Sequence, residues 1–521
     1  MDTTKILPPR TSKPYPGRRR VPDSTTAPQG EGTSSGRTAS RPAARGRFHR
    51  TVGLVIAVLA AAAAASLWAA VAIGGPSRVE GPASGVILGL WRVLYNTDTP
   101  PVRVLATATA LAVLLAAGVA LLEQRIATRS RRSANPVSTP LAPRIVMAAT
   151  RGAYSGPVSV TVLIPAHNEE ASLPATIASL RTQSHPPERI IVVADNCTDA
   201  TIALARRAGV EVFESVNNSR KKAGALNQAL TWILPAQGPN DVVMVMDADT
   251  RIDDGFLAAA VQRFTDDRAL MAVGGLFYGE LGHGLLGQFQ RNEYIRYSRQ
   301  IRRRRGRVFV LTGTASLFRP AALRTVAEQR GVSIPGTNGD VYDTAALTED
   351  NELTIALKSL GALIISPHQC TVVTELMPTW SMLWAQRLRW QRGALENIGA
   401  YGVTPQTLRY WVQQLGIGYG VLALGSYLLL GVLMVLSLDE WVWFPFWLGL
   451  GALFMVERVC TVWKGGWRAR LLAATLLPEL CFDMFLNIVY VKGIIDISLG
   501  RAADWKHVPH TSAVDEQETA L

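Results

Sequence analysis

Short apolar runs alternate with amphipathic ones between residues 155 and 275 of this chain. Three of the runs are typical of buried parallel strands, at 158–165, 189–194 and 241–246. Helical patterns separate them, at 170–182, 198–208 and 222–234. This rhythm predicts right-handed βαβ crossovers, and therefore an α/β fold built on a mostly parallel, doubly wound sheet.

A cluster of polar residues follows each predicted strand, at 165–170, 195–199 and 247–249. The carboxyl ends of parallel strands lie at one edge of a sheet, and ligands bind in the crevice beyond that edge. We therefore expect the three clusters to line a single crevice.

The last cluster, Asp247-Ala248-Asp249, places two carboxylates just past a buried strand. Both can reach one hard cation, and Mg²⁺ or Mn²⁺ binds such oxygens while keeping substrate phosphates in its shell. The alternative is a solvated turn that caps the next helix. Beside the other two clusters, the pattern favours a metal that neutralises a diphosphate leaving group.

Segments 165–170 and 195–199 carry side chains that can hydrogen-bond a nucleoside base and ribose. Segment 220–227 places cations and small residues at a predicted helix start, which suits phosphates. Asn168, Thr198 and Asp199 also suit the N-caps of the following helices. Binding and capping are compatible, and both stay open.

Thr348-Glu349-Asp350 supplies two adjacent carboxylates at the start of a helical pattern. An inverting group transfer needs a base that takes the proton from the acceptor hydroxyl. Asp350 is the predicted base, and Glu349 is predicted to position it or the acceptor. The alternative is a capping pattern, with Thr348 before an acidic first turn.

Gln386-Arg387-Leu388-Arg389-Trp390 lies on another predicted helix. Gln386, Arg389 and Trp390 share one face of that helix. Arg389 can bind a diphosphate, and Trp390 offers a flat apolar surface to a sugar ring. An amphipathic helix resting on lipid headgroups is the alternative, since Trp380 and Trp384 precede Trp390.

Charge and hydrophobicity are distributed unevenly along the 521 residues. The first 50 residues hold 11 basic and 3 acidic side chains, which accounts for +8 of the net charge of +13. This predicts a disordered cytoplasmic tail attracted to anionic lipid rather than to nucleic acid. The uncharged segments 52–73 and 104–122 are long enough to span a bilayer. A cleaved signal peptide is the alternative for the first. Their basic flanks place residues 125–408 in the cytosol.

Three apolar segments, at 410–438, 441–456 and 471–497, predict a C-terminal membrane region. If all three cross, the C-terminus lies outside; if the last re-enters or lies flat, it stays inside. Glu479, Asp483 and Asn487 repeat within the last segment, where they line a polymer route or pair internally. Residues 285–305 are predicted to form a surface helix against anionic lipid. The four separate cysteines suggest neither a disulfide framework nor a zinc site.

Together these motifs resemble the processive family 2 glycosyltransferases, the synthases of poly-N-acetylglucosamine, chitin, hyaluronan and cellulose. The resemblance covers residues 155–400 and implies a GT-A fold, Mg²⁺ or Mn²⁺, and inverting transfer from a UDP-sugar. It assigns the nucleotide-sugar contacts to Ala166, Asn168, Glu169, Asp195, Lys222, Asp247, Gln386 and Arg389. It assigns the metal to Asp247 and Asp249, the general base to Asp350, and acceptor contacts to Trp390.

Residues 311–319 resemble the acceptor-proximal loop of these enzymes, which adds Gly313 and Thr314 to the predicted acceptor contacts. This chain departs from the family in two places. Pro320 follows Arg319 where a second basic residue is usual, and Asp195-Asn196 replaces the common Asp-Asp or Asp-Gly pair.

The expected organisation is a basic tail (1–50), two transmembrane helices (51–124), a cytosolic GT-A domain (155–405), a C-terminal membrane region (410–500) and a tail (501–521). The expected function is transfer of sugar from a UDP-sugar, such as UDP-N-acetylglucosamine, to a β-linked polysaccharide at the cytoplasmic face of the cell membrane. A glycolipid synthase that makes single transfers and a catalytically silent membrane scaffold are the alternatives. The expected partners are the UDP-sugar, a polysaccharide or glycolipid acceptor and membrane lipid.

Overall fold

The structure is a computed structural model that describes residues 83–87, 91–95, 134–150, 156–304, 306–436, 441–443 and 445–501. The predicted basic tail, both predicted N-terminal spans and the chain beyond residue 501 lie outside the described residues. The expectations for those segments stay predictions.

A seven-stranded sheet forms the centre of the domain, in the order β11-β8-β10-β6-β3-β4-β5. Its strands are β3 (Ser159–Ala166), β4 (Arg189–Ala194), β5 (Glu211–Glu214), β6 (Asp241–Met246), β8 (Leu270–Gly274), β10 (Ala315–Phe318) and β11 (Leu363–Ile365). All neighbours pair in parallel except β10, which is antiparallel to both β6 and β8. The predicted α/β fold with a mostly parallel sheet is confirmed.

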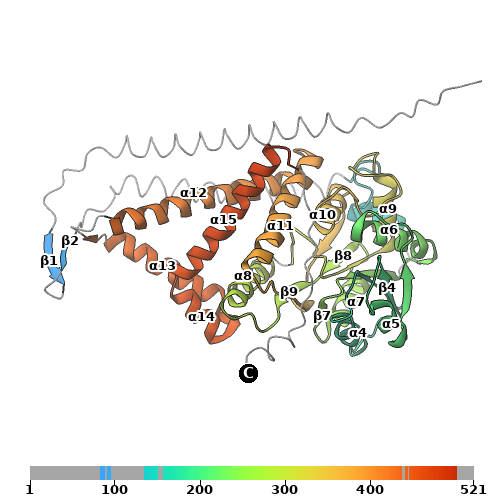
Figure 1. Ribbon diagram of the computed structural model, residues 1–521. Helices are drawn as coiled ribbons and strands as arrows, with labels where there is room; N and C mark the ends of the chain where they lie inside the picture. Colours follow the sequence, from blue (N-terminus) through green and yellow to red (C-terminus); the bar gives the residue numbers. More distant parts are fainter. Residues whose placement is uncertain are drawn as a thin grey trace, which may run out of the picture. The chain divides into compact units, whose positions relative to one another are not determined.

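The central strands are buried on both faces, which is why their sequences are almost continuously apolar. Leu163 and Val243 enter one core, whereas Val162 and Met244 enter the other. The first core is closed by α6 (Lys221–Ile233), α9 (Pro320–Gln329) and α10 (Glu349–Ser359). The second is closed by α4 (Leu173–Arg181), α5 (Thr201–Arg207) and α7 (Phe256–Asp266), so helices cover both faces of the sheet (Figure 1).

β10 has no counterpart among the predicted elements, because four residues are too few to give a periodic signal. Since β10 is antiparallel, its beginning lies at the edge where β6 ends. The backbone N–H of Asp247 accordingly donates to the carbonyl oxygen of Thr314, at 3.2 Å. This strand therefore brings residues 311–314 to the predicted crevice.

A second sheet of three strands lies outside the central one, in the order β7-β12-β9. Its members are β7 (Thr250–Ile252), β9 (Leu276–Gly279) and β12 (Thr371–Thr374). β9 leads into α8 (Gly284–Arg303), and β12 leads into α11 (Trp380–Tyr401). A short helix, α3 (Pro143–Ala149), precedes the central sheet in the chain. The two long helices thus start from strands that adjoin the segment after Asp247-Ala248-Asp249.

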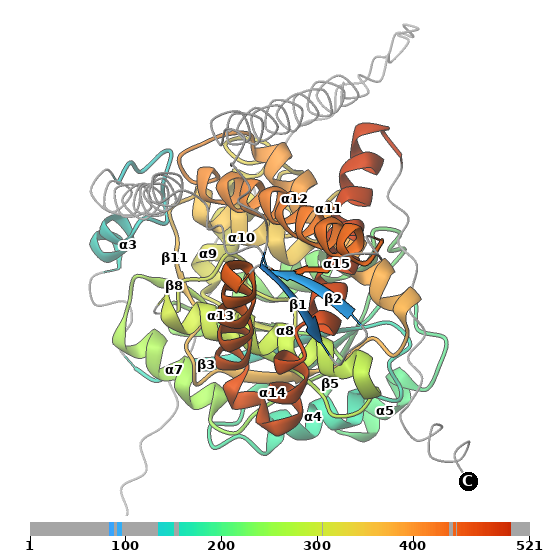
Figure 2. The ribbon, with the colours of Figure 1, turned by 90° about the vertical axis from the view of Figure 1, so that its left-hand side faces the viewer.

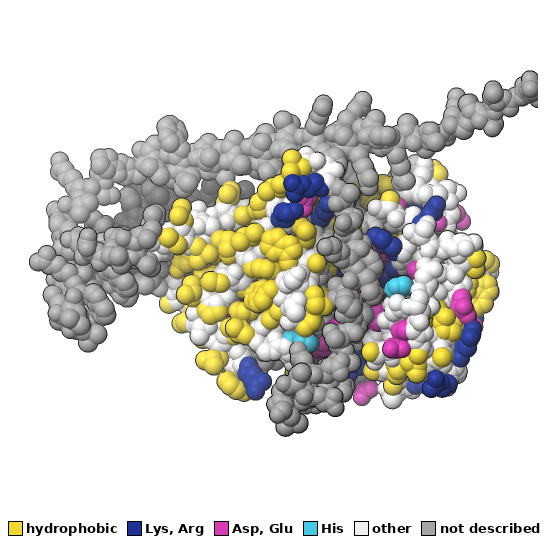
Figure 3. Space-filling view, viewed as in Figure 1, with side chains coloured by type: hydrophobic (Ala, Val, Ile, Leu, Met, Phe, Trp, Pro, Cys, Tyr) yellow, Lys and Arg dark blue, Asp and Glu magenta, His cyan; other side chains and the backbone are white. Residues whose placement is uncertain are grey.

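The C-terminal region contains α12 (Leu408–Leu436), β13 (Trp441–Trp443), α13 (Pro445–Thr461), α14 (Gly466–Ala474) and α15 (Leu477–Ser498). Among the described residues, one stretch, Leu408–Leu429, is by length and composition able to cross a membrane on its own. Residues Trp463–Ala474 and Leu477–Ser498 pass the same test only as one broken span, bent by 91°. Hydrophobic side chains cover much of the visible face of this region (Figure 3). How many of the predicted crossings form stays open.

β13 pairs with β2 (Trp91–Tyr95), which in turn pairs with β1 (Ala83–Ile87). These two strands fall between the two predicted N-terminal spans, in a stretch for which no structure was predicted. The strand pairing joins that stretch to the segment between α12 and α13.

Residues 285–303 of this segment do lie in a helix, α8, but the prediction that its apolar side rests against lipid is wrong. Phe289, Tyr294 and Ile301 are all buried in protein. α8, α13 and α14 lie side by side (Figure 2), and the Phe289 ring stacks on that of Phe482 in α15, with centroids 4.8 Å apart. The apolar face of α8 therefore joins the catalytic domain to the C-terminal helices.

Two of the polar residues in the last predicted apolar segment, Glu479 and Asp483, form ion pairs instead of lining an open route for a polymer. Glu479 is buried, accepts a hydrogen bond from Asn292 of α8 at 2.8 Å, and pairs with Arg296. Asp483 pairs with Arg458 of α13. For these two carboxylates internal pairing, the alternative to a polymer route, is confirmed.

Candidate active site

Three polar clusters meet at one edge of the central sheet. They follow β3, β4 and β6, which are neighbours and parallel. The ring Nδ1 of His167 lies 2.6 Å from the carbonyl oxygen of Asp195, and the N–H of Asp195 donates to Ala166 at 2.9 Å. The predicted convergence of the strand-end clusters is confirmed.

Asp195 is the centre of the predicted nucleoside contacts and is only 8% exposed. Its Oδ1 accepts hydrogen bonds from Ser215 at 2.6 Å, Asn218 at 2.8 Å and Asn196 at 3.1 Å. Asn196 has a φ of 50°, a left-handed conformation that Asn tolerates better than most residues. The loop thus fixes the Asp195 carboxylate before any ligand binds.

The predicted capping roles of Asn168 and Thr198 are wrong, because α4 and α5 begin after Ser172 and Ala200. Asp199 does cap α5, since its Oδ1 accepts from the backbone N–H of Thr201, the first residue of that helix, at 3.0 Å. Oδ1 of Asn168 instead accepts from the backbone N–H of Thr198 at 2.8 Å, which ties two loops together. Glu169 is close to this junction, and its carboxylate accepts from the Ser172 hydroxyl at 2.7 Å.

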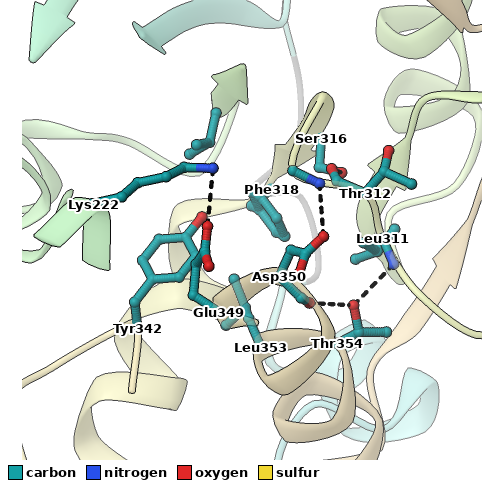
Figure 4. Close-up of a pocket in the computed structure, with 12 residues that line it drawn as sticks. Lys222, Leu311, Thr312, Ser316, Phe318, Tyr342, Glu349, Asp350, Leu353 and Thr354 are labelled. Carbon is teal, nitrogen blue, oxygen red and sulfur yellow. Dashed lines mark hydrogen bonds and ion pairs between the residues drawn. The ribbon is translucent and has the colours of Figure 1, made fainter. Parts of the chain in front are cut away.

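Lys222 joins the carboxylates of two distant motifs. Its Nζ lies 2.6 Å from Oδ1 of Asp247. It also lies 2.9 Å from Oε1 of Glu349 (Figure 4). The three side chains are between 21% and 28% exposed, so the cluster is withdrawn from bulk water yet reachable. Lys222 comes from the first turn of α6, as predicted, and neutralises part of the negative charge at this edge.

Asp350 faces the same space from the first turn of α10 (Figure 4). Its Oδ2 accepts from the backbone N–H of Gly313 at 3.1 Å, and its Oδ1 from the N–H of Asn351 at 2.7 Å. A Cβ at Gly313 would lie 3.3 Å from Nζ of Lys222, 3.4 Å from Oδ2 of Asp247 and 3.7 Å from Oδ2 of Asp350. The absent side chain of Gly313 therefore leaves the space between these charged groups open.

The two acidic residues of α10 are in different electrostatic environments. Burial, and then the charge of Glu349, raises the pKa of Asp350 to about 6. Burial acts to raise the pKa of Glu349 as well, but the Lys222 ammonium outweighs this effect and lowers that pKa. Pairs of carboxyl groups whose pKa values are pushed apart are typical of acid–base sites. Asp350 has the properties of a proton acceptor, and Glu349 those of a fixed anion.

Asp247 and Asp249 suit a divalent cation that also binds a diphosphate. Among the described residues no three His, Cys, Asp or Glu side chains form a metal-binding group, so the protein would contribute these two carboxylates. Mg²⁺ and Mn²⁺ sites in nucleotide enzymes commonly have this composition, with substrate phosphates completing the shell. The opening at Gly313 lies directly against Oδ2 of Asp247. The residues therefore fit the predicted metal.

The Gln386–Trp390 motif lies in α11, and its charge reaches the same cluster. Arg389 acts to lower the pKa values of both Asp247 and Glu349, so its positive charge is within electrostatic range of both carboxylates. Oε1 of Gln386 is shielded from solvent without a hydrogen-bond partner among the described residues. The ring of Trp390 lies 4.3 Å from the guanidinium carbon of Arg387. The charge of this motif thus acts on the other two, while the contacts of Gln386 and Trp390 with substrate stay predictions.

Arg387, which was not predicted, has a supporting role within this motif. It is 2% exposed and forms an ion pair of 2.8 Å with Glu293 of α8. Its guanidinium therefore fixes the Trp390 ring and anchors α11 to α8. The presence of a basic residue beside Arg389 in the motif was the available signal, but its half-buried acidic partner lies 94 positions earlier in the chain.

Thr348 is the N-cap of α10, as the capping alternative expected, but its hydroxyl does not cap the helix. It accepts instead from Nδ2 of Asn397 in α11 at 3.1 Å, and the same Nδ2 donates to the Thr348 carbonyl at 3.0 Å. Gly393, one turn before Asn397, lets α11 approach Thr348 closely. Neither Asn397 nor Gly393 was predicted, and together they fix the beginning of α10, where Asp350 lies.

A buried ion pair holds the next turn of α10. Arg330 donates to both carboxylate oxygens of Glu352, at 2.8 and 2.7 Å, and both residues are at most 1% exposed. The hydroxyl of Tyr401, at the end of α11, donates to the same carboxylate at 2.5 Å. Because breaking a buried charge pair leaves one charge unpaired, this arrangement strongly resists movement of α10.

Gly393→Ala should displace the catalytic helix. The new Cβ would lie 2.4 Å from Oγ1 and 2.7 Å from Cγ2 of the buried Thr348, so α10 or α11 must shift. We expect about 1–3 kcal/mol of destabilisation from overpacking and a loss of kcat approaching about 10²-fold from misplacing Asp350. Thermal unfolding and kcat are the measurements. Gly416→Ala in α12, where a Cβ meets nothing within 4 Å, is the matched control. It should leave kcat unchanged and should not lower the stability, because Ala favours a helix more than Gly does.

Residues 161–327 match the family described as Glycosyl transferase family 2. The chain is 28% identical over 244 residues to the poly-beta-1,6-N-acetyl-D-glucosamine synthase of Staphylococcus aureus (strain COL), covering 46% of this chain and 55% of that protein. It is 30% identical over 248 residues to the probable glycosyltransferase YdaM of Bacillus subtilis (strain 168), covering 45% and 54%. The chain thus spans about half the length of the curated relatives it matches.

Among solved structures, a mannosyltransferase from Pyrobaculum calidifontis in complex with GDP-Man and Mn²⁺ is 18% identical, with a TM-score of 0.41 over 75% of this chain and 99% of that one. TarS from S. aureus is also 18% identical, with a TM-score of 0.32 over 51% of this chain and 43% of that one.

Proposed function

We propose that this chain, which carries a glycosyl transferase family 2 domain of the GT-A type, transfers a sugar from a UDP-sugar to a growing β-linked polysaccharide with inversion at the sugar carbon. The observation that carries the proposal is the position of Asp350, whose carboxylate faces the Lys222–Asp247–Glu349 cluster across the opening at Gly313. A base and a diphosphate site on opposite sides of one small space are what an inverting transfer requires.

Each part of the site has a role in this reaction. Asp350 takes the proton from the acceptor hydroxyl as that oxygen attacks the sugar. Lys222 and Arg389 balance the negative charge that develops on the leaving diphosphate. Glu349 holds Lys222 in place through its ion pair of 2.9 Å.

The proposed substrate contacts divide by the part of the substrates that they would hold. Ala166, Asn168, Glu169 and Asp195 hold the uridine end of the donor, and Gln386 contacts its diphosphate or sugar. Gly313, Thr314 and Trp390 contact the acceptor, with the Trp390 ring packing on a sugar face. Asp247 and Asp249 would hold Mg²⁺ or Mn²⁺, which when bound supplies positive charge to the diphosphate.

The donor is proposed from a named relative, and the cellular location is proposed from the apolar segments. UDP-N-acetylglucosamine is the proposed donor, because poly-beta-1,6-N-acetyl-D-glucosamine synthase is among the matching proteins. A multi-pass cell-membrane location with the catalytic domain in the cytosol is proposed from the apolar segments of the sequence and their basic flanks. The length and composition of α12 support one of these crossings. We propose that the extended polysaccharide is also passed across the bilayer at this place.

Activity should be lost at low pH, in an acidic limb of the pH profile that is set by protonation of Asp350. A general base works only when deprotonated, so kcat/KM should fall tenfold per pH unit below about pH 6, the raised pKa of this carboxyl. An ordinary Asp would place that limb near its usual value of 3.8. Glu349→Gln removes a neighbouring negative charge and should move the limb to lower pH. A limb that stays in place in this variant would show that another group is titrating.

One experiment tests the function as a whole. Membranes containing the full chain are supplied with a panel of radiolabelled nucleotide sugars and Mg²⁺ or Mn²⁺, and the products are sized. A long polymer from UDP-N-acetylglucosamine that disappears in Asp350→Asn supports the proposal. A product with one added sugar would identify a glycolipid synthase instead. UDP release that is absent with every donor would leave the scaffold alternative, whereas UDP release that is equal in Asp350→Asn would show that another group is the base.

A further inference from the structure

Two arginines from different helices pack on one aromatic ring at the start of α12. Arg304 follows the last turn of α8, and Arg409 lies in the first turn of α12. Their guanidinium carbons are 4.9 and 4.2 Å from the centre of the Phe309 ring. Arg409 also donates to the carbonyl oxygen of Val308 at 3.1 Å. Ring and backbone contacts of this kind hold cations in place without neutralising them.

A third cation lies behind these two. Nζ of Lys358, from α10, donates to the hydroxyl of Tyr410 at 2.8 Å and to the carbonyl oxygen of Phe309 at 3.2 Å. Burial, and then the charge of Arg409, lowers the pKa of Lys358 well below its ordinary value. The positive charges at this place therefore repel one another, which is typical of a site that lacks its anion.

The protein supplies no such anion among its described residues. None of the ion pairs there involves Arg304, Lys358 or Arg409. Nε of Arg409 is shielded from solvent and has no hydrogen-bond partner. Further basic side chains of the same segment are exposed, at Arg302, Arg303 and Arg307.

The position of the cluster identifies the kind of anion. Arg409 begins the helix that is apolar enough to cross a bilayer, and the exposed apolar side chains of that helix start at Leu415 and Tyr419. Six residues of helix separate Arg409 from Leu415, a rise of about 9 Å. A helix whose apolar surface enters the acyl chains at Leu415 thus has its first turn at the level of the lipid phosphates.

We propose that Arg304 and Arg409, extended by Arg302, Arg303 and Arg307, bind the phosphate headgroup of an anionic phospholipid. This inference rests on the membrane placement in the proposed function and goes beyond it by defining a lipid site. The site adjoins the catalytic loop, since Phe309 precedes Leu311, whose N–H donates to Thr354 of α10 at 2.9 Å. A bound headgroup therefore orders the segment that leads to Gly313.

The test uses the full chain in nanodiscs of phosphatidylcholine mixed with phosphatidylglycerol. Native mass spectrometry measures which lipid stays bound after release from the disc. We expect the wild type to retain phosphatidylglycerol preferentially, and Arg409→Gln to lower that preference about fivefold, the effect of one basic residue near a membrane surface. Arg304→Gln should have the same effect and keeps the test valid if Arg409→Gln does not fold.

Arg470→Gln is the matched control, because Arg470 also packs on a ring, that of Trp463 at 4.1 Å, and also donates to a backbone carbonyl. It should leave the lipid preference unchanged. An equal loss in Arg470→Gln would show general attraction of charge to the membrane and would overturn the site. So would displacement of the lipid by millimolar inorganic phosphate, which would identify a soluble anion as the occupant. The readout needs no sugar transfer, so failure of the catalytic proposal is seen separately.

Discussion

Asp350→Asn is expected to lower kcat by about 10²–10⁴, the usual contribution of a positioned general base. The carboxamide keeps the shape of the side chain, and its oxygen can still accept from Gly313, 3.1 Å away in the wild type. It cannot take a proton from the acceptor hydroxyl. The fold and the KM for the donor should therefore change little while turnover is nearly lost, as measured by UDP release.

Asp343→Asn is the control for this variant. Asp343 is also a largely buried carboxylate that accepts a backbone N–H, that of Ala345 at 3.0 Å, but it lies outside the Lys222 cluster. Its amide variant should keep most of the activity. Turnover near the wild-type level in Asp350→Asn would refute the assignment of the base.

Asp249→Ala is expected to remove the effect of Mn²⁺ on nucleotide binding. The predicted site has only two protein carboxylates, so losing one should lower the affinity for the metal at least about 100-fold. This is the upper end of the loss seen when a residue that supports a metal ligand is replaced. Calorimetric titration of UDP with and without Mn²⁺ measures this directly. The variant should bind UDP equally under both conditions.

Asp253→Ala provides the comparison from the other end of β7. Asp253 is an exposed carboxylate that accepts from the Thr371 hydroxyl at 2.5 Å, four residues beyond Asp249. This variant should retain the effect of Mn²⁺. If Asp249→Ala also retained it, the cation would have to be held by other groups.

The parts of the fold that were predicted have strong local signals. β4 and β6 have the predicted bounds, because strands buried on both faces are continuous apolar runs. β10 was missed, since a four-residue antiparallel strand has neither the length nor the periodicity to be distinguished from a loop. That strand is what places Gly313 beside Asp350, so the site was predicted more completely than the topology that builds it.

The same contrast holds within the site. Lys222, Asp247, Glu349 and Asp350 meet as the motifs predicted, whereas Arg387, Gly393 and Asn397 were missed. The missed residues act through partners far away in the chain, such as Thr348 for Asn397, 49 positions earlier. The capping role of Asn168 failed for a related reason. Its side chain bonds a neighbouring loop, which no local pattern encodes.

α11 contacts two helices of different character along its length. On one side Gly393 lies against Thr348 at the start of α10; on another, a Cβ at Gly493 of α15 would lie 3.6 Å from Leu388 and 3.8 Å from the backbone of Arg392. If α15 lies in the lipid, its tilt follows the thickness of the bilayer. The same tilt then moves α11 and, through it, the carboxylate that accepts the proton. Acyl-chain length would thereby set the rate of a reaction that takes place entirely in water.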